Sequence, residues 1–103
     1  GIVENMSYFT PEELPNNKYY IFGKDGAKDL AEQLGIDLLA QIPIVQSLRE
    51  ASDAGRPAVL QEDSAISNSF LNFAKEVVKS VDKRNSNLPS TEAVKITNMK
   101  GCS

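Results

Sequence analysis

The apolar run that opens the chain constrains its fold more than any other segment. Residues 1–9 read Gly-Ile-Val-Glu-Asn-Met-Ser-Tyr-Phe, and we interpret Ile2 to Met6 as a buried strand. A strand that begins at residue 1 needs neighbouring strands, since a sheet of two or three strands is a poor structure on its own. We therefore expect the chain to be the C-terminal piece of a larger domain, with much of the chemistry of that domain upstream of Ile2.

Composition excludes several classes of function. With 103 residues the chain forms one domain or part of one. It contains no histidine, which removes Ser-His-Asp and Cys-His catalysis within the chain. Its single cysteine, Cys102, excludes an internal disulfide and suits a reducing compartment. The net charge of −3 argues against a nucleic-acid partner, and no apolar run approaches the roughly 18 residues of a membrane span.

Strand and helix patterns alternate along the rest of the chain. The predicted elements are a loop at 10–17, a short strand or extended edge at 19–22, a helix at 25–34, a strand at 36–42, a helix at 44–54, a short extended piece at 57–60 and a long helix from about 64 to 81. The order of strand, helix, strand and helix with short connections argues for an α/β fold with parallel pairing.

Local signals predict where the helices begin and end. We expect Asp25 to cap the helix at 25–34 and Gly35 to end it, and Asp63 or Ser64 to cap the longest helix. The predicted apolar stripes are Ala27, Leu30, Ala31 and Leu34 in the first helix, and Ile66, Phe70, Phe73, Ala74, Val77 and Val81 in the longest. Residues 82–91 are polar, and 93–97 form either a strand or a tail. We therefore divide the chain into a domain at 1–82 and a polar linker and tail at 83–103.

Two motifs invite a functional interpretation. The run from Gly23 to Lys28 is only superficially like a phosphate-binding loop, because Ala27 stands where that loop requires a lysine, and we interpret it as a turn and helix start. Asn5 and Pro43 each close a predicted strand, and ligands of open α/β sheets bind at the carboxyl ends of strands. From spacing alone, both also have structural explanations, as a turn-capping asparagine and a strand-ending proline.

Five segments share their order and spacing with one known family. They are GIVENMSYF at 1–9, YIFGKDG at 20–26, the helix and its glycine at 27–35, the strand end LAQIP at 39–43 and LREASDAGRP at 48–57. Over about residues 1–81 the chain resembles the C-terminal half of the Mrp/ApbC family, which are MinD-like P-loop ATPases that carry iron–sulfur clusters.

This resemblance implies a fold, a ligand and a set of site residues. The fold would be the C-terminal part of a doubly wound, mostly parallel sheet of the P-loop NTPase type. Asn5 would match the family's asparagine that meets the adenine of ATP, and Ile42, Pro43 and Ile44 would match the segment whose backbone lines the adenine pocket. The parent protein would be a cytoplasmic homodimer that binds ATP and Mg, hydrolyses ATP slowly and passes clusters to apoproteins.

Two departures limit what this chain carries. The family's phosphate loop, magnesium ligands and catalytic aspartate lie upstream, so we expect the chain to be inactive alone. Many members carry a Cys-x-x-Cys pair after the ENMSYF stretch, but Thr10 to Asn17 contain no cysteine, which argues against cluster binding by this segment. Two alternatives remain open: a non-catalytic dimerisation or partner-docking module, and a partitioning or septum-positioning ATPase. The polar tail does not resemble the membrane-targeting end that the second usually carries.

Overall fold

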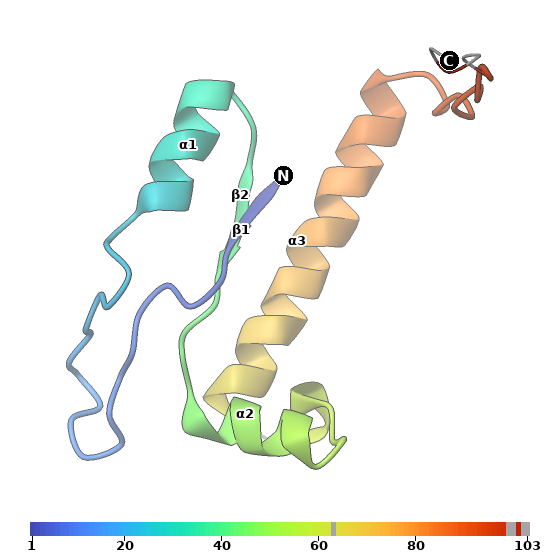
Figure 1. Ribbon diagram of the computed structural model, residues 1–103. Helices are drawn as coiled ribbons and strands as arrows, with labels where there is room; N and C mark the ends of the chain where they lie inside the picture. The colour runs from blue at the N-terminus through green and yellow to red at the C-terminus, as the bar shows by residue number, and fades with distance from the viewer. Residues whose placement is uncertain (63, 99–100, 102–103) are drawn as a thin grey trace.

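Two short parallel strands lie between helices in the computed structural model, which describes residues 1–62, 64–98 and 101 (Figure 1). Strand β1 (Ile2–Glu4) pairs with β2 (Leu38–Gln41), with α1 (Gly26–Leu34) on one side and α3 (Ala65–Asn87) on the other. Helix α2 (Gln46–Asp53) and the short 3₁₀ helix η1 (Ala58–Leu60) connect β2 to α3. The α/β class and the parallel pairing predicted from the sequence are confirmed.

Both strands are shorter than predicted. Ile2 pairs with Leu38 and Glu4 with Gln41, with an irregularity in register after Ile2. The first strand ends at Glu4 rather than Met6 because Met6 adopts a φ of 54°, which turns the chain out of the extended conformation. The predicted strand at 36–42 contracts to the four residues of β2.

The core is small for a chain of this length. Ile42, Ala58 and Ile66 form a buried cluster where β2, η1 and α3 meet. Leu71 and Val78 of α3 remain 47% and 60% exposed, because the strand pair covers only part of the apolar arc of this helix. The radius of gyration is 18.5 Å, against about 13 Å for a compact chain of similar size. The described chain therefore leaves much apolar surface without a partner.

Two of the predicted helix ends are confirmed and one is wrong. Gly35 ends α1 with a φ of 64°, the left-handed conformation that favours glycine. Ser64 caps α3, since its hydroxyl accepts the Ser67 N–H at 3.1 Å, whereas Asp63 lies outside the described residues. Asp25 does not cap α1 through its side chain. Its carboxylate instead accepts a hydrogen bond from the side-chain amide of Gln41 at 3.0 Å.

Two predicted extended segments have other structures. Residues 19–22 form no strand, because only Tyr19 pairs, in an isolated antiparallel bridge with Phe9, and a turn closed by Gly23 N–H and the Tyr20 carbonyl follows at 3.2 Å. Residues 58–60 form η1 rather than an extended piece. Pro57, with a φ of −58°, begins this turn, in which the Leu60 N–H donates to the Pro57 carbonyl at 3.0 Å.

The longest helix continues beyond the predicted end at Val81. Helix α3 runs through the polar residues 82–87, and its C-cap Leu88 directly precedes Pro89. Charged residues continue a helix readily, whereas the residue before a proline is disfavoured in the helical region, so Pro89 marks the end. Residues 93–97 form no strand, and Val94 is 90% exposed. Among the described residues, no helix is both long and apolar enough to cross a membrane.

Candidate functional site

The carboxyl ends of β1 and β2 meet at one edge of the sheet, where the structure places Asn5 beside Ile42. The Ile42 N–H donates to the Glu4 carbonyl at 2.8 Å, and three residues after Glu4 the Ser7 N–H donates to the Ile42 carbonyl at 2.9 Å. The turn formed by Asn5 and Met6 is therefore bracketed by hydrogen bonds to the residue that follows β2. Two positions 37 residues apart in the sequence become neighbours through strand pairing.

The next residues of both segments run side by side. The Ile44 N–H donates to the Tyr8 carbonyl at 2.7 Å, and Phe9 and Ile44 form an isolated parallel bridge. Pro43 is half-buried and has no N–H to donate, so it interrupts the backbone hydrogen bonds between Ile42 and Ile44. The structure thus brings together all four residues that the resemblance implied: Asn5, Ile42, Pro43 and Ile44.

These four residues differ in what they present to a ligand. Ile42 is 3% exposed and its side chain belongs to the core, so only the backbone at this position is available for contact. Asn5 is exposed, and its side-chain oxygen accepts the Met6 N–H at 2.9 Å. The side-chain NH₂ of Asn5 has no hydrogen-bond partner in the described part of the chain. This arrangement leaves a donor at the edge of the sheet, in the turn that is bonded to Ile42.

A polar cluster that the sequence did not predict lies behind the turn. The carboxylate of Glu4, the last residue of β1, accepts the Ser7 hydroxyl through Oε1 and the Ala27 N–H through Oε2, both at 3.0 Å. Gln41, the last residue of β2, donates to Asp25. Polar residues inside two predicted apolar strands were a signal for this cluster, but their partners at the start of α1 depend on the tertiary fold.

An aromatic and basic group flanks the edge. The rings of Tyr8 and Tyr20 lie 6.3 Å apart at an interplanar angle of 59°. The ammonium group of Lys18 sits 4.3 Å from the centroid of Tyr8, and that of Lys24 sits 5.2 Å from the centroid of Tyr20. These contacts hold the loop at 10–18 against the segment that follows β1.

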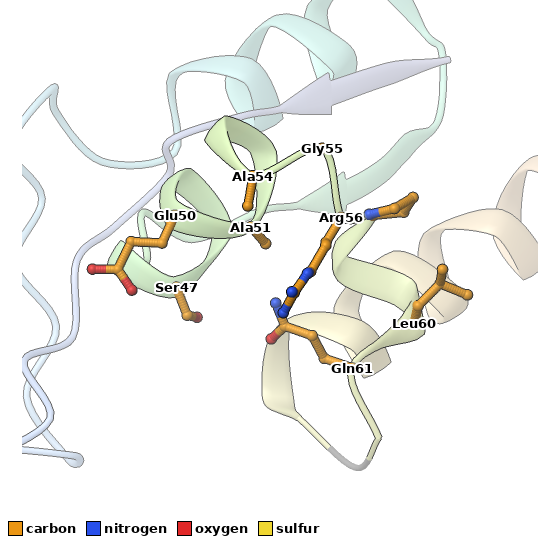
Figure 2. Close-up of a pocket in the computed structure, with 9 residues that line it drawn as sticks. Ser47, Glu50, Ala51, Ala54, Gly55, Arg56, Leu60 and Gln61 are labelled. Atoms are coloured by element: carbon orange, nitrogen blue, oxygen red, sulfur yellow. The ribbon is translucent and has the colours of Figure 1, made fainter.

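Two hollows of the surface involve helix α2, and neither is part of this edge. One of about 610 Å³ is formed where α2 leads into η1, and Figure 2 shows Ser47, Arg56 and Gln61 around it. Another of about 300 Å³ lies between the loop at 10–13 and the start of α2. Neither is lined by Asn5 or Pro43. The candidate edge is exposed at Asn5 and is not part of either hollow.

The described residues do not fit a metal or cluster site. No group of three or more histidine, cysteine, aspartate or glutamate side chains among residues 1–62, 64–98 and 101 is placed to hold a metal ion. The loop at 10–17, where many Mrp/ApbC proteins carry two cysteines, contains none, and Cys102 lies outside the described residues. Thiolate ligands for an iron–sulfur cluster are therefore not supplied by this edge.

Comparison with known proteins assigns the family. The sequence model of the NUBPL iron-transfer P-loop NTPases, a group described under ParA, matches residues 1–78. The chain belongs to this family. It is 48% identical over 84 residues to the iron–sulfur cluster carrier protein of Saccharolobus solfataricus, covering 80% of the chain and 28% of that protein. The predicted resemblance to Mrp/ApbC carriers is confirmed.

Eukaryotic members of the NUBPL family are similar over the same part of the chain. The iron–sulfur cluster transfer protein NUBPL of Dictyostelium discoideum is 41% identical over 83 residues, with 80% of the chain and 25% of that protein covered. NUBPL of Mus musculus is 44% identical over 80 residues, with 77% and 25% covered. The chain thus spans about a quarter of the length of the curated relatives it matches.

Proposed function

We propose that this chain supplies the adenine side of the nucleotide site in a longer P-loop ATPase that carries iron–sulfur clusters. The observation that carries the proposal is the pairing that sets Asn5 beside Ile42, Pro43 and Ile44 at the carboxyl edge of parallel strands. Ligands of open α/β sheets bind at this edge. The exposed amide of Asn5 can donate to and accept from the edge of a base, as adenine recognition requires.

The remaining parts of such an ATPase belong to the same proposal. The chain contains no Gly-x-x-x-x-Gly-Lys-Ser/Thr sequence, so the contacts to phosphate and Mg come from elsewhere in the protein, and the chain alone does not hydrolyse ATP. The small sheet and the uncovered face of α3 support a larger, doubly wound sheet in which β1 and β2 are two of several parallel strands.

In this proposal the longer protein carries iron–sulfur clusters and transfers them to other proteins. The relatives that are named carriers and transfer proteins support iron–sulfur cluster delivery to apoproteins. They favour this role over partitioning or septum positioning. That the protein acts as a cytoplasmic homodimer is part of the proposal and is implied by the resemblance to the Mrp/ApbC family. The residues present do not fit a cluster, since the chain has one cysteine, so cluster ligands are assigned to other parts of the protein.

Substitution of Asn5 tests the nucleotide role. In the full-length protein we expect Asn5→Ala to weaken ATP binding about five- to tenfold, the loss of one or two hydrogen bonds, with the melting temperature of the nucleotide-free protein unchanged. Isothermal titration calorimetry with ATP measures the dissociation constant. Asn72→Ala is the matched control, because Asn72 is an exposed asparagine on α3. Unchanged ATP affinity in Asn5→Ala refutes the adenine assignment.

A docking module is the second candidate, and the uncovered apolar face of α3 favours it. Leu71, Val78 and Val81 lie at helical spacing and are each about half exposed or more. A module that acts through this face forms a stable dimer or partner complex without nucleotide. Light scattering coupled to size-exclusion chromatography of the 103-residue chain distinguishes the candidates, since a monomer that is unaffected by concentration argues against self-docking.

A further inference from the structure

Glu4 connects three separate segments of the chain. Its backbone carbonyl accepts the Ile42 N–H at 2.8 Å, which continues the pairing of β1 with β2. One carboxylate oxygen accepts the Ser7 hydroxyl and the other accepts the Ala27 N–H in the first turn of α1, each at 3.0 Å. The side chain is half-buried. One residue therefore joins the end of β1, the following turn and the start of α1.

The turn between Glu4 and Ser7 needs this support. Met6 adopts a φ of 54°, in the left-handed region, where a residue with a β-carbon is strained. Ser7 is 3% exposed, and its hydroxyl finds its acceptor in Glu4. Loss of that acceptor leaves a buried hydroxyl unpaired, which is costly, and removes a restraint from the strained turn that carries Asn5.

The hydrogen bond from Ala27 to Glu4 also fixes the start of α1. Asp25, which precedes the helix, makes no side-chain cap and has a φ of 59°. The free Ala27 N–H is instead satisfied by the Glu4 carboxylate, where the positive end of the helix favours a negative charge. Gln41, at the end of β2, holds the Asp25 carboxylate at 3.0 Å. The last residues of both strands thus tie α1 to the edge of the sheet, and α1 becomes the anchor for the turn.

We propose that Glu4 is a positioning residue that holds the Asn5 turn in its base-binding conformation by tying it to the N-terminus of α1. This inference rests on the proposed role of Asn5 in adenine binding. Glu4 acts only through the turn, since both of its carboxylate oxygens are engaged with Ser7 and Ala27 rather than with the open surface.

The experiment is a double-substitution cycle in the full-length protein. ATP dissociation constants are measured by calorimetry for wild type, Glu4→Ala, Asn5→Ala and the double variant. We expect each single variant to lose about five- to tenfold in affinity and the double variant to lose no more than Asn5→Ala alone, because residues that act through one another are not additive. Losses that multiply, or an unchanged affinity in Glu4→Ala, overturn the positioning role.

Conservative variants separate positioning from folding. Glu4→Gln keeps the length of the side chain and one acceptor oxygen for the Ala27 N–H, and the serine hydroxyl can accept from the new NH₂ group. We expect ATP affinity within about twofold of wild type for Glu4→Gln. Glu4→Asp is one methylene shorter and cannot span Ser7 and Ala27 together, so we expect it to bind ATP as weakly as Glu4→Ala. Equal affinities for the Gln and Asp variants contradict the proposal.

The outcomes distinguish this inference from the function on which it rests. Unchanged ATP affinity in Asn5→Ala overturns the adenine assignment and, with it, the role of Glu4. If Asn5→Ala weakens ATP binding and Glu4→Ala does not, only the proposed role of Glu4 is overturned. If the melting curve shows that Glu4→Ala does not fold, the cycle is run with Ser7→Ala instead. This variant removes the hydroxyl group that donates to Glu4 and leaves the hydrogen bond between Glu4 and Ala27 intact. The same non-additivity with Asn5→Ala is then expected, and its absence refutes the proposal.

Discussion

Replacement of Ile66 by alanine tests whether the small core holds the strand pair and α3 together. Ile66 is 3% exposed and packs in a cluster with Ile42 and Ala58. Among the described residues, Ile42 and Ile66, each 3% exposed, are the large apolar side chains that are buried, while the other buried apolar residues are alanines. One side chain therefore contributes a large share of the hydrophobic stabilisation.

The expected loss follows from the burial of that side chain. Truncation of a buried isoleucine to alanine removes its transfer free energy and leaves a cavity, which together cost about 3 kcal/mol within a range of roughly 2–5 kcal/mol. For a domain of about 100 residues this lowers the melting temperature by about 12–24 °C. Since small domains have a free energy of unfolding near the lower end of about 5–15 kcal/mol, Ile66→Ala removes about half of the total.

Urea denaturation followed by circular dichroism measures the free energy of unfolding. Ile66→Val, which removes a single methyl group, is expected to lose about 1 kcal/mol and keeps the test informative if the alanine variant does not fold. Val78→Ala on the same helix is the matched control, because Val78 is 60% exposed, and we expect it to stay within about 0.5 kcal/mol of wild type. A loss of less than about 1 kcal/mol for Ile66→Ala, or a loss no larger than that of Val78→Ala, refutes this account of the core.

The remaining predictions concern the ends of helices, and thermal melting of the 103-residue chain measures both. Ser64→Ala removes the acceptor of the Ser67 N–H, and we expect it to lower the free energy of unfolding by about 1 kcal/mol. Ser69→Ala is the control and is expected to be near neutral, because the Ser69 hydroxyl donates to a carbonyl within α3. Gly35→Ala forces a residue with a β-carbon to adopt a φ of 64°, and we expect it to lower the free energy of unfolding by about 1 kcal/mol. Gly26→Ala is expected to be neutral or stabilising, because its φ is not positive and its β-carbon meets nothing within 4 Å. Equal melting temperatures within either pair contradict the corresponding assignment.

Helices and their ends were the most predictable part of the fold. The apolar spacing of α1 and α3, the cap at Ser64 and the termination at Gly35 depend on residues within a turn or two of each other, so the local sequence contains the signal. The end of α3 was misplaced because polarity was taken to mark a linker, although lysine and arginine continue a helix and Pro89 marks the end. Polarity identifies exposure, and it does not by itself end a helix.

Segments whose structure depends on distant partners were predicted less well. Tyr19 to Phe22 have strand-forming residues, but the paired partner stops at Phe9, so no strand develops. Asp25 has the side chain of a helix cap, yet Gln41 occupies its carboxylate and Glu4 satisfies the helix in its place. A missing partner in the first case, and a tertiary contact in the second, outweighed the local preference.

The sequence by itself determined the family and the alternation of strands and helices. The order and spacing of similar segments carry that information, which requires no coordinates. Only the tertiary structure decided that the Asn5 turn lies beside Ile42 and that Glu4 ties this edge to α1. The physical reason is that parallel pairing joins residues far apart in the chain, and a side-chain hydrogen bond over 23 residues leaves no periodic trace in the sequence.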